Sequence, residues 1–136
     1  MEHHAPKFQE EYSSKLPALT LLSNLGWAFL SPDQALAARG GKLDEVVLRA
    51  ELNKHLAKRR FMFAGQEYPL PQHAIDNLIA EVCSLALNEG LLTANEKLYN
   101  HLVYGIAVTV FVDGKKYSPT IALVDWEHPE NNSYLF

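Results

Sequence analysis

Two carboxylates lie two residues apart in the stretch VDWEHPENN, residues 124–132. If the chain is extended there, Asp125 and Glu127 point to the same side, because side chains alternate along a strand. Together with His128 they could contribute to a divalent-cation site, but hard cations need more oxygen ligands than these provide. The pattern is also typical of an acid at a strand end that pairs with a base or caps the following turn. We favour this structural interpretation for Asp125 and predict no metal site.

The sequence KHLAKRR, residues 54–60, is the one basic cluster of the chain. Lys54 and Lys58 are four residues apart and would share one helix face, which Arg59 and Arg60 extend. These four side chains are candidate contacts to nucleic-acid phosphates. The cluster is also typical of a solvated helix end, where cations complement the helix dipole, and no aromatic residue is interleaved among the cations. Both interpretations remain open at this point.

Other catalytic patterns are absent from the sequence. His55, His73 and His101 fall on separate predicted helices and form no H-E-x-x-H pattern. There is neither a G-x-S-x-G elbow nor a G-x-x-x-x-G-K-[ST] loop. Cys83 is the only cysteine, which excludes an internal disulfide and a cysteine-based zinc site and fits a reducing compartment.

Helical periodicity dominates the first two thirds of the sequence. Pro17 is expected to break the first helix or to begin a new one. Asp44 is the expected cap of the second helix, and Thr93 with Glu96 forms a capping-box pattern for the last. Residues 61–71 are expected to be irregular. The predicted helices span about residues 8–25, 44–60, 72–89 and 93–104.

After Gly105 the apolar period changes to that of strands. The segments IAVTVFV and TIALVDW are predicted to pair through a turn at residues 113–114, with Pro119 at an edge position and a possible third strand at 133–136. Because both strand faces are largely apolar, we expect helices to cover both. This order indicates an α+β fold, with about four helices packed on a small, mostly antiparallel sheet.

The length and charge of the chain limit the classes of protein to which it can belong. Its 136 residues suit a single domain, mostly helical over residues 1–92, with a helix and a β-hairpin over residues 93–136. The net charge of −4 excludes nucleic-acid binding through bulk charge. We expect a cytoplasmic protein without a membrane partner, because the sequence has neither a signal peptide nor an apolar run of about 18 residues.

Five stretches, in this order, resemble the N-terminal region of the R (HsdR) subunit of type I restriction endonucleases. They are FQEEY, LPALTLLSNLGWAFLSP, ALAARGGKLDEVVL, GLLTANEKLYNHLVYGIAV and VDGKKYSPTIALVDWEHPENNSYLF. The last stretch contains an Asp-Trp-x-x-Pro-x-Asn-Asn segment that is similar to one just ahead of the family's nuclease core. Together these stretches cover nearly the whole chain.

This resemblance implies the leading part of a restriction-endonuclease-like, PD-(D/E)XK domain in a larger nuclease and translocase chain. The parent would cleave DNA with Mg²⁺ and ATP, in a complex with modification (methyltransferase) and specificity subunits. Its catalytic Asp and Glu-x-Lys would lie beyond Phe136, so the fragment is expected to be inactive alone and to bind neither cofactor. Glu11 best matches the family's helix carboxylate, which can help to hold Mg²⁺. The alternative is a non-catalytic DNA-positioning or protein-interaction module that uses residues 54–60.

Overall fold

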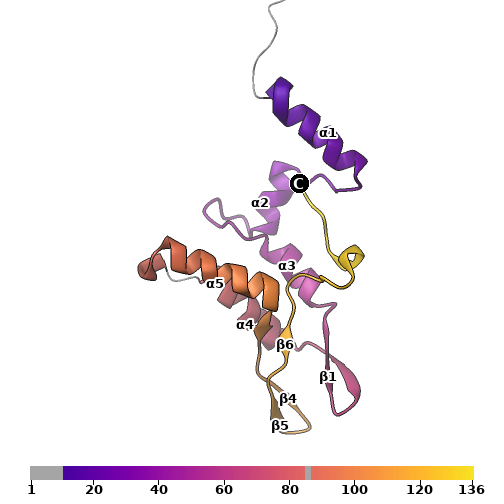
Figure 1. Cartoon of the computed structure of the whole chain (residues 1–136), viewed down its shortest axis with the longest axis vertical. Helices are drawn as coiled ribbons and strands as arrows, with labels where there is room; N and C mark the ends of the chain where they lie inside the picture. Colours follow the sequence, from indigo (N-terminus) through magenta and orange to yellow (C-terminus); the bar gives the residue numbers. More distant parts are fainter. Residues whose placement is uncertain (1–10, 85–86) are drawn as a thin grey trace, which may run out of the picture.

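The computed structural model describes residues 11–84 and 87–136, without the side chains of residues 11, 12 and 87. These residues form the predicted α+β fold, with five α-helices rather than about four (Figure 1). The helices are α1 (Leu16–Asn24), α2 (Pro32–Ala38), α3 (Arg49–Leu56), α4 (Gln72–Cys83) and α5 (Leu91–Tyr104). Short helical turns are η1 (Glu11–Lys15), η2 (Leu87–Glu89) and η3 (Pro129–Asn131). The strands are β1 (Arg60–Phe63), β2 (Gln66–Pro69), β3 (Ile106–Ala107), β4 (Val110–Val112), β5 (Lys115–Tyr117) and β6 (Thr120–Ile121).

The first two α-helices begin where proline is tolerated. Pro17 lies in the first turn of α1, as the sequence predicted, because its missing N–H would have no partner there. Ser31 caps α2 in a capping box, in which the Ser31 hydroxyl accepts from Gln34 N and the Gln34 amide accepts from Ser31 N. Helix α1 has no fully buried residue and stands away from the rest of the molecule in Figure 1.

Two predicted helix starts are wrong. Asp44 caps nothing, because α3 begins only at Arg49. The Glu45 carboxylate instead accepts hydrogen bonds from Val47 N at 3.3 Å and Arg49 Nε at 2.7 Å. Helix α5 begins at Leu91 rather than at a Thr93 cap. Gly90 precedes it with φ 97° and ψ 154°, a conformation open essentially to glycine alone.

Two predicted helix ends are also too late. The second predicted helix was expected to run to about Arg60, but α3 ends at Leu56 and Arg60 already belongs to β1. The third was expected to run to about residue 89, but α4 ends at Cys83 because Ser84 leaves the helical conformation with φ −102° and ψ 34°.

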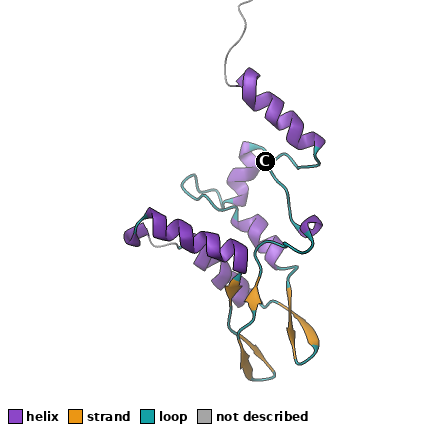
Figure 2. Ribbon diagram, viewed as in Figure 1, coloured by secondary structure: helices purple, strands orange, loops and turns teal. Residues whose placement is uncertain are grey.

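Three short antiparallel ladders lie together at one end of the molecule (Figure 2). β1 and β2 form a hairpin where the sequence predicts an irregular segment, so that prediction is wrong. Ladders β3–β6 and β4–β5 share one register, so they are two parts of a single long hairpin closed by the predicted turn at residues 113–114. Val108 N donates to Pro119 O at 3.0 Å between them. Pro119 has no N–H to return that bond, so the ladder is interrupted there.

The returning arm of the long hairpin differs from its prediction. It begins at Lys115 and ends at Ile121, whereas the predicted strand ran on to Trp126. The other arm alternates strictly: Ile106, Val108, Val110 and Val112 are buried, and the residues between them are exposed. The expectation that helices cover both strand faces is therefore wrong.

The buried strand face joins α3 and α4 in one core. Leu56, Ile75, Leu78 and Val110 are its largest fully buried side chains. The other buried members are Phe61, Leu70, Ala74, Ile79, Ile106, Val108, Val112, Ile121 and Leu123. Helices α3 and α4 thus cover one face of the hairpins, and no helix within the described residues is long and apolar enough to cross a membrane.

The last residues pair with the segment between α1 and α2. Ala28 and Leu135 form a parallel bridge, so residues 133–136 contact residues 27–30 instead of extending the hairpin. The aromatic rings of Trp27 and Tyr134 lie 5.3 Å apart, and those of Phe29 and Phe136 lie 5.5 Å apart. The C-terminal residues are thereby held near α2, as Figure 1 shows.

Candidate functional site: a charged junction at Asp125

Asp125 is the centre of a hydrogen-bonded junction rather than the end of a strand. Its Oδ1 accepts from His128 N at 2.9 Å. Its Oδ2 accepts from Asn131 Nδ2 at 3.1 Å and from Arg59 Nη1 at 3.3 Å. The His128 N–H, the Asn131 amide and the Arg59 guanidinium lower the pKa of Asp125 to about 2, because each favours the charged carboxylate.

The backbone of Asp125 is held by Asn132 at the same time. Asp125 N donates to Asn132 Oδ1, and Asn132 Nδ2 donates to Asp125 O, both at 2.9 Å. Farther along, the Tyr134 hydroxyl donates to Pro129 O at 2.8 Å. The spacing in DWEHPENN therefore builds a closed turn, in which the acid and the two asparagines satisfy each other. This outcome confirms that Asp125 pairs with a base and also caps the following turn.

The base that pairs with Asp125 comes from the basic cluster. Arg59 lies three residues beyond the end of α3, and the ion pair joins residues 66 positions apart in the sequence. The Arg59 and Asp125 side chains are only 18% and 14% exposed, so solvent screens the pair less than it screens a surface pair. The C-terminal segment is thereby fixed to the end of α3.

His55 completes the junction one helical turn before Arg59. Its Nε2 lies 3.0 Å from Leu123 O and 3.3 Å from Arg59 Nη2. One nitrogen cannot serve both groups, because the carbonyl needs a donor and the guanidinium needs an acceptor. Burial, and then the Arg59 charge, lowers the pKa of His55. The neutral imidazole that donates to Leu123 O satisfies a buried carbonyl.

The carboxylates of this region do not fit a Mg²⁺ site. Both Asp125 oxygens already accept hydrogen bonds, while Glu127 is exposed and His128 lies 3.3 Å from the Glu130 carboxylate. Among residues 11–84 and 87–136, no group of three or more His, Cys, Asp or Glu side chains could hold a metal ion. The backbone of Glu11 opens η1, but its side chain lies outside the described residues.

The four candidate DNA contacts do not form one surface cluster. Arg59 is bound to Asp125, and Lys54 Nζ lies 3.9 Å from the Glu51 carboxylate. Lys58 follows the end of α3, and Arg60 is the first residue of β1. Lys58 and Arg60 are exposed, whereas Arg59 is mostly buried. The shared helix face expected for Lys54 and Lys58 is wrong, because the helix ends between them.

The three helical histidines have different surroundings. His55 belongs to the junction, and His73 is exposed on α4. His101 Nε2 lies 3.1 Å from the Glu81 carboxylate, so it links α5 to α4. Cys83, at the end of α4, is half-buried, and burial raises the pKa of its thiol. Of these groups, only His55 belongs to the junction.

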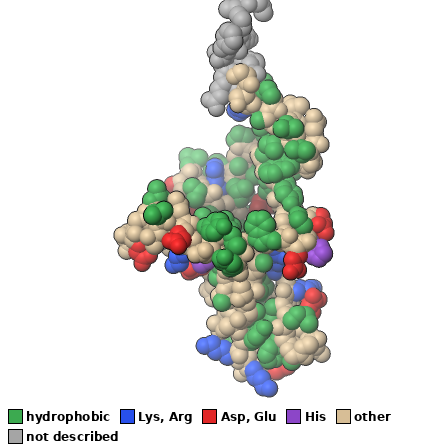
Figure 3. Space-filling model, in the orientation of Figure 1, with side chains coloured by type: hydrophobic (Ala, Val, Ile, Leu, Met, Phe, Trp, Pro, Cys, Tyr) green, Lys and Arg blue, Asp and Glu red, His purple; other side chains and the backbone are tan. Residues whose placement is uncertain are grey.

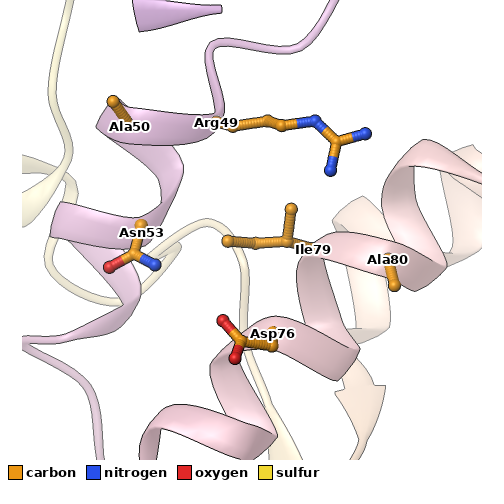
Figure 4. Close-up of a pocket in the computed structure, with 6 residues that line it drawn as sticks. All are labelled: Arg49, Ala50, Asn53, Asp76, Ile79 and Ala80. Atoms are coloured by element: carbon orange, nitrogen blue, oxygen red, sulfur yellow. The ribbon is translucent and has the colours of Figure 1, made fainter. Parts of the chain in front are cut away.

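A hollow of about 670 Å³ lies between α3 and α4 (Figure 4). Arg49 and Asp76 bring charge to it, but Arg49 is bound to Glu45, and Asp76 accepts from Gln72 Nε2 at 2.9 Å. In Figure 4 the polar ends of Asn53 and Asp76 face each other across the gap. The lining residues are Arg49, Ala50, Asn53, Asp76, Ile79 and Ala80.

Trp126, Asn131 and Asn132 belong to the family-like segment of the sequence, but the sequence alone assigned them no structural role. Asn131 and Asn132 follow an Asp-x-x-x-Pro pattern, and asparagine commonly closes turns through its side chain, so this signal was available. Trp126 Nε1 donates to Leu102 O at 3.0 Å, which joins the turn to α5. No local pattern marks that contact, because its partners are 24 residues apart.

The fold and the junction define an α+β scaffold in which a charged side-chain network fastens the C-terminal segment to the helical layer. The chain belongs to the family described as the type I restriction enzyme R protein N terminus (HSDR_N), whose model matches residues 7–136. The resemblance found in the sequence is thus confirmed over essentially the whole chain. No curated protein and no solved structure matches it.

Proposed function

We propose that this chain is the non-catalytic N-terminal scaffold of an R subunit that cleaves DNA in type I restriction. The family match over residues 7–136 is the observation that carries the proposal. The parent would act as an ATP- and Mg²⁺-dependent endonuclease in the cytoplasm, assembled with modification and specificity subunits on DNA. The catalytic Asp and Glu-x-Lys would come from R-subunit residues outside this chain.

The hydrogen bonds and the ion pair of the Asp125 carboxylate support a positioning role for the described residues. Three donors occupy its carboxylate oxygens, and one of them is a mostly buried guanidinium. Removing one partner of a buried ion pair is costly because the other charge is left uncompensated. The VDWEHPENN stretch therefore acts here as a rigid turn, which can set the direction of the polypeptide that a nuclease core requires.

A chimera provides the test of this function. Residues 7–136 would replace the N-terminal region of a type I R subunit, which is then assembled with its modification and specificity subunits. We expect cleavage of unmodified plasmid with Mg²⁺ and ATP, and no cleavage by the 136-residue chain alone. In a matched chimera, Asp125→Arg places two cations together and should reduce cleavage. Failure of the soluble, assembled chimera to cut, or robust cutting by the isolated chain, would overturn the proposal.

The alternative, DNA positioning through residues 54–60, has less structural support. Of the four cations in this cluster, only Lys58 and Arg60 are exposed and have no ion pair to a described residue. If they contact phosphates, the double variant Lys58→Glu, Arg60→Glu should weaken DNA binding and reduce the slope of log K against log salt by about 2. Lys42→Glu, an exposed cation outside the cluster, is the control. Unchanged binding by the double variant would exclude this role.

A further inference from the structure

An apolar groove lies beside the Asp125 junction. It has a volume of about 650 Å³ and is bounded by α3, the ends of α4 and α5, and residues 123–135. Its apolar lining includes Leu52, Leu102, Trp126 and Leu135. Trp126 is 63% exposed and Leu102 is 39% exposed. Large apolar side chains left in contact with water around a groove of this size are typical of a binding surface.

Hydrophobic side chains extend beyond the groove on the same molecule. In Figure 3 they gather over α1 and across the middle of the visible face, whereas Lys and Arg side chains are scattered over this face, including the end that carries the hairpins. Tyr99 and Tyr104 of α5 are exposed as well. Exposed apolar side chains are therefore present on α5 beyond those that line the groove.

The extended segment around Leu135, which forms a single parallel bridge with Ala28, borders this groove and has an open main-chain edge. On the side that faces residues 28–30, this segment forms three backbone hydrogen bonds. Ala28 N donates to Tyr134 O, Leu30 N donates to Phe136 O, and Phe136 N donates to Ala28 O. In a parallel ladder the groups of the intervening residue, Leu135, point to the opposite side. Within the described residues, Leu135 N and O form no hydrogen bond, although the Leu135 side chain lines the groove. An edge of this kind is a template for another strand.

These two features together select an extended polypeptide rather than a small apolar molecule. Unpaired N–H and C=O groups are matched by a neighbouring strand, whose alternate side chains would enter the groove. The family is described as the N terminus of an R protein, so the remainder of that protein is the polypeptide with the highest local concentration.

We propose that the groove and the Leu135 edge seat an extended apolar segment from the remainder of an R protein, which adds as a strand beside Leu135. This inference rests on the proposed function. The Arg59–Asp125 ion pair holds the receiving strand on the helical layer, and Trp126 and Leu102 form the wall against which the incoming side chains pack.

A binding experiment in trans tests the docking surface. The 136-residue chain, labelled with ¹⁵N, is titrated with a purified R-subunit fragment that carries the nuclease and motor regions but lacks the N-terminal region. We expect saturable binding and at least tenfold slower hydrogen exchange at the Leu135 amide. Leu102→Gln should weaken binding at least tenfold. Leu92→Gln, on the same helix, 83% exposed and outside the groove lining, should leave affinity within twofold.

Other results would overturn the inference in distinguishable ways. Absence of binding, equal weakening by both variants, or unchanged exchange at Leu135 excludes strand addition at this edge. Protection of Leu135 that rises with the concentration of the chain alone identifies a second copy as the occupant. Restriction by the chimera without docking in trans would refute only this inference, whereas docking without restriction would refute the proposed function.

Discussion

Gly105 is the position at which a single methyl group should damage the fold most specifically. It links α5 to β3 with φ 80° and ψ −174°, a region open essentially to glycine alone. A Cβ there would lie 2.5 Å from Ile121 O and 2.9 Å from Ile121 C. Both atoms are backbone, and Ile121 pairs with Ile106 in the two-residue β3–β6 ladder. The clash therefore cannot be relieved by a side-chain rotation.

Gly90 provides the matched control, because it shares the backbone conformation but not the contact. Its φ of 97° and ψ of 154° lie in the same region, and a Cβ there meets nothing within 4 Å. Gly90→Ala should cost about 1–3 kcal/mol from backbone strain alone. Gly105→Ala should cost the same strain and about 1–3 kcal/mol more, the range typical of forcing atoms into a packed site.

Chemical and thermal denaturation followed by circular dichroism separate these two costs. For a chain of this length, 1 kcal/mol corresponds to about 3–5 °C in Tm, so Gly105→Ala should melt at least 3 °C below Gly90→Ala. The free energies of unfolding from urea titrations should differ in the same direction. Equal destabilisation by the two variants would refute the steric reasoning and leave only a backbone effect.

Two further predictions concern the junction and the short hairpin. Folding lowers the pKa of Asp125 from 3.8 to about 2, so the carboxylate adds stability above pH 4 that is lost as the pH falls toward 2. Urea titrations should therefore find wild type more stable than Asp125→Asn at pH 7, with a gap that closes below pH 4; a gap independent of pH would contradict the ion pair. Ala64 opens the β1–β2 turn with φ 50°, where asparagine is more readily accommodated. Ala64→Asn should thus raise stability by up to about 1 kcal/mol, measured as Tm, whereas a lower Tm would argue against this turn.

The sequence predicted those elements whose signals are local and strong. The turn at residues 113–114 was predictable because aspartate and glycine are the residues that tolerate the positive φ values of 50° and 76°. The turn at residues 64–65 has the same geometry, but alanine rarely adopts it, so the β1–β2 hairpin was missed. Thr93 and Glu96 matched a capping pattern, yet α5 starts at Leu91 because Gly90 already turns the chain there.

The junction was predictable in kind but not in its partners. The residues around Asp125 indicated an acid that pairs with a base and caps a turn, and the structure confirms this. Nothing in the local sequence indicates which base, because Arg59 is 66 positions away and belongs to a cluster that suggested phosphate binding. The same limit explains why the groove was not foreseen, since its lining comes from three helices and the C-terminal segment.

The position of Arg59 connects the two interpretations of the basic cluster. A cation at the exposed end of a helix is available to phosphate, but Arg59 is turned inward and neutralised by Asp125. The attraction that turns Arg59 inward also fixes residues 125–132, and through them the segment around Leu135. An open strand edge binds its partner better if it is already rigid, because ordering a mobile segment on binding costs conformational entropy. The charged junction thus contributes to recognition by keeping the neighbouring edge rigid, because Arg59 holds the Asp125 side chain and Asn132 holds its backbone.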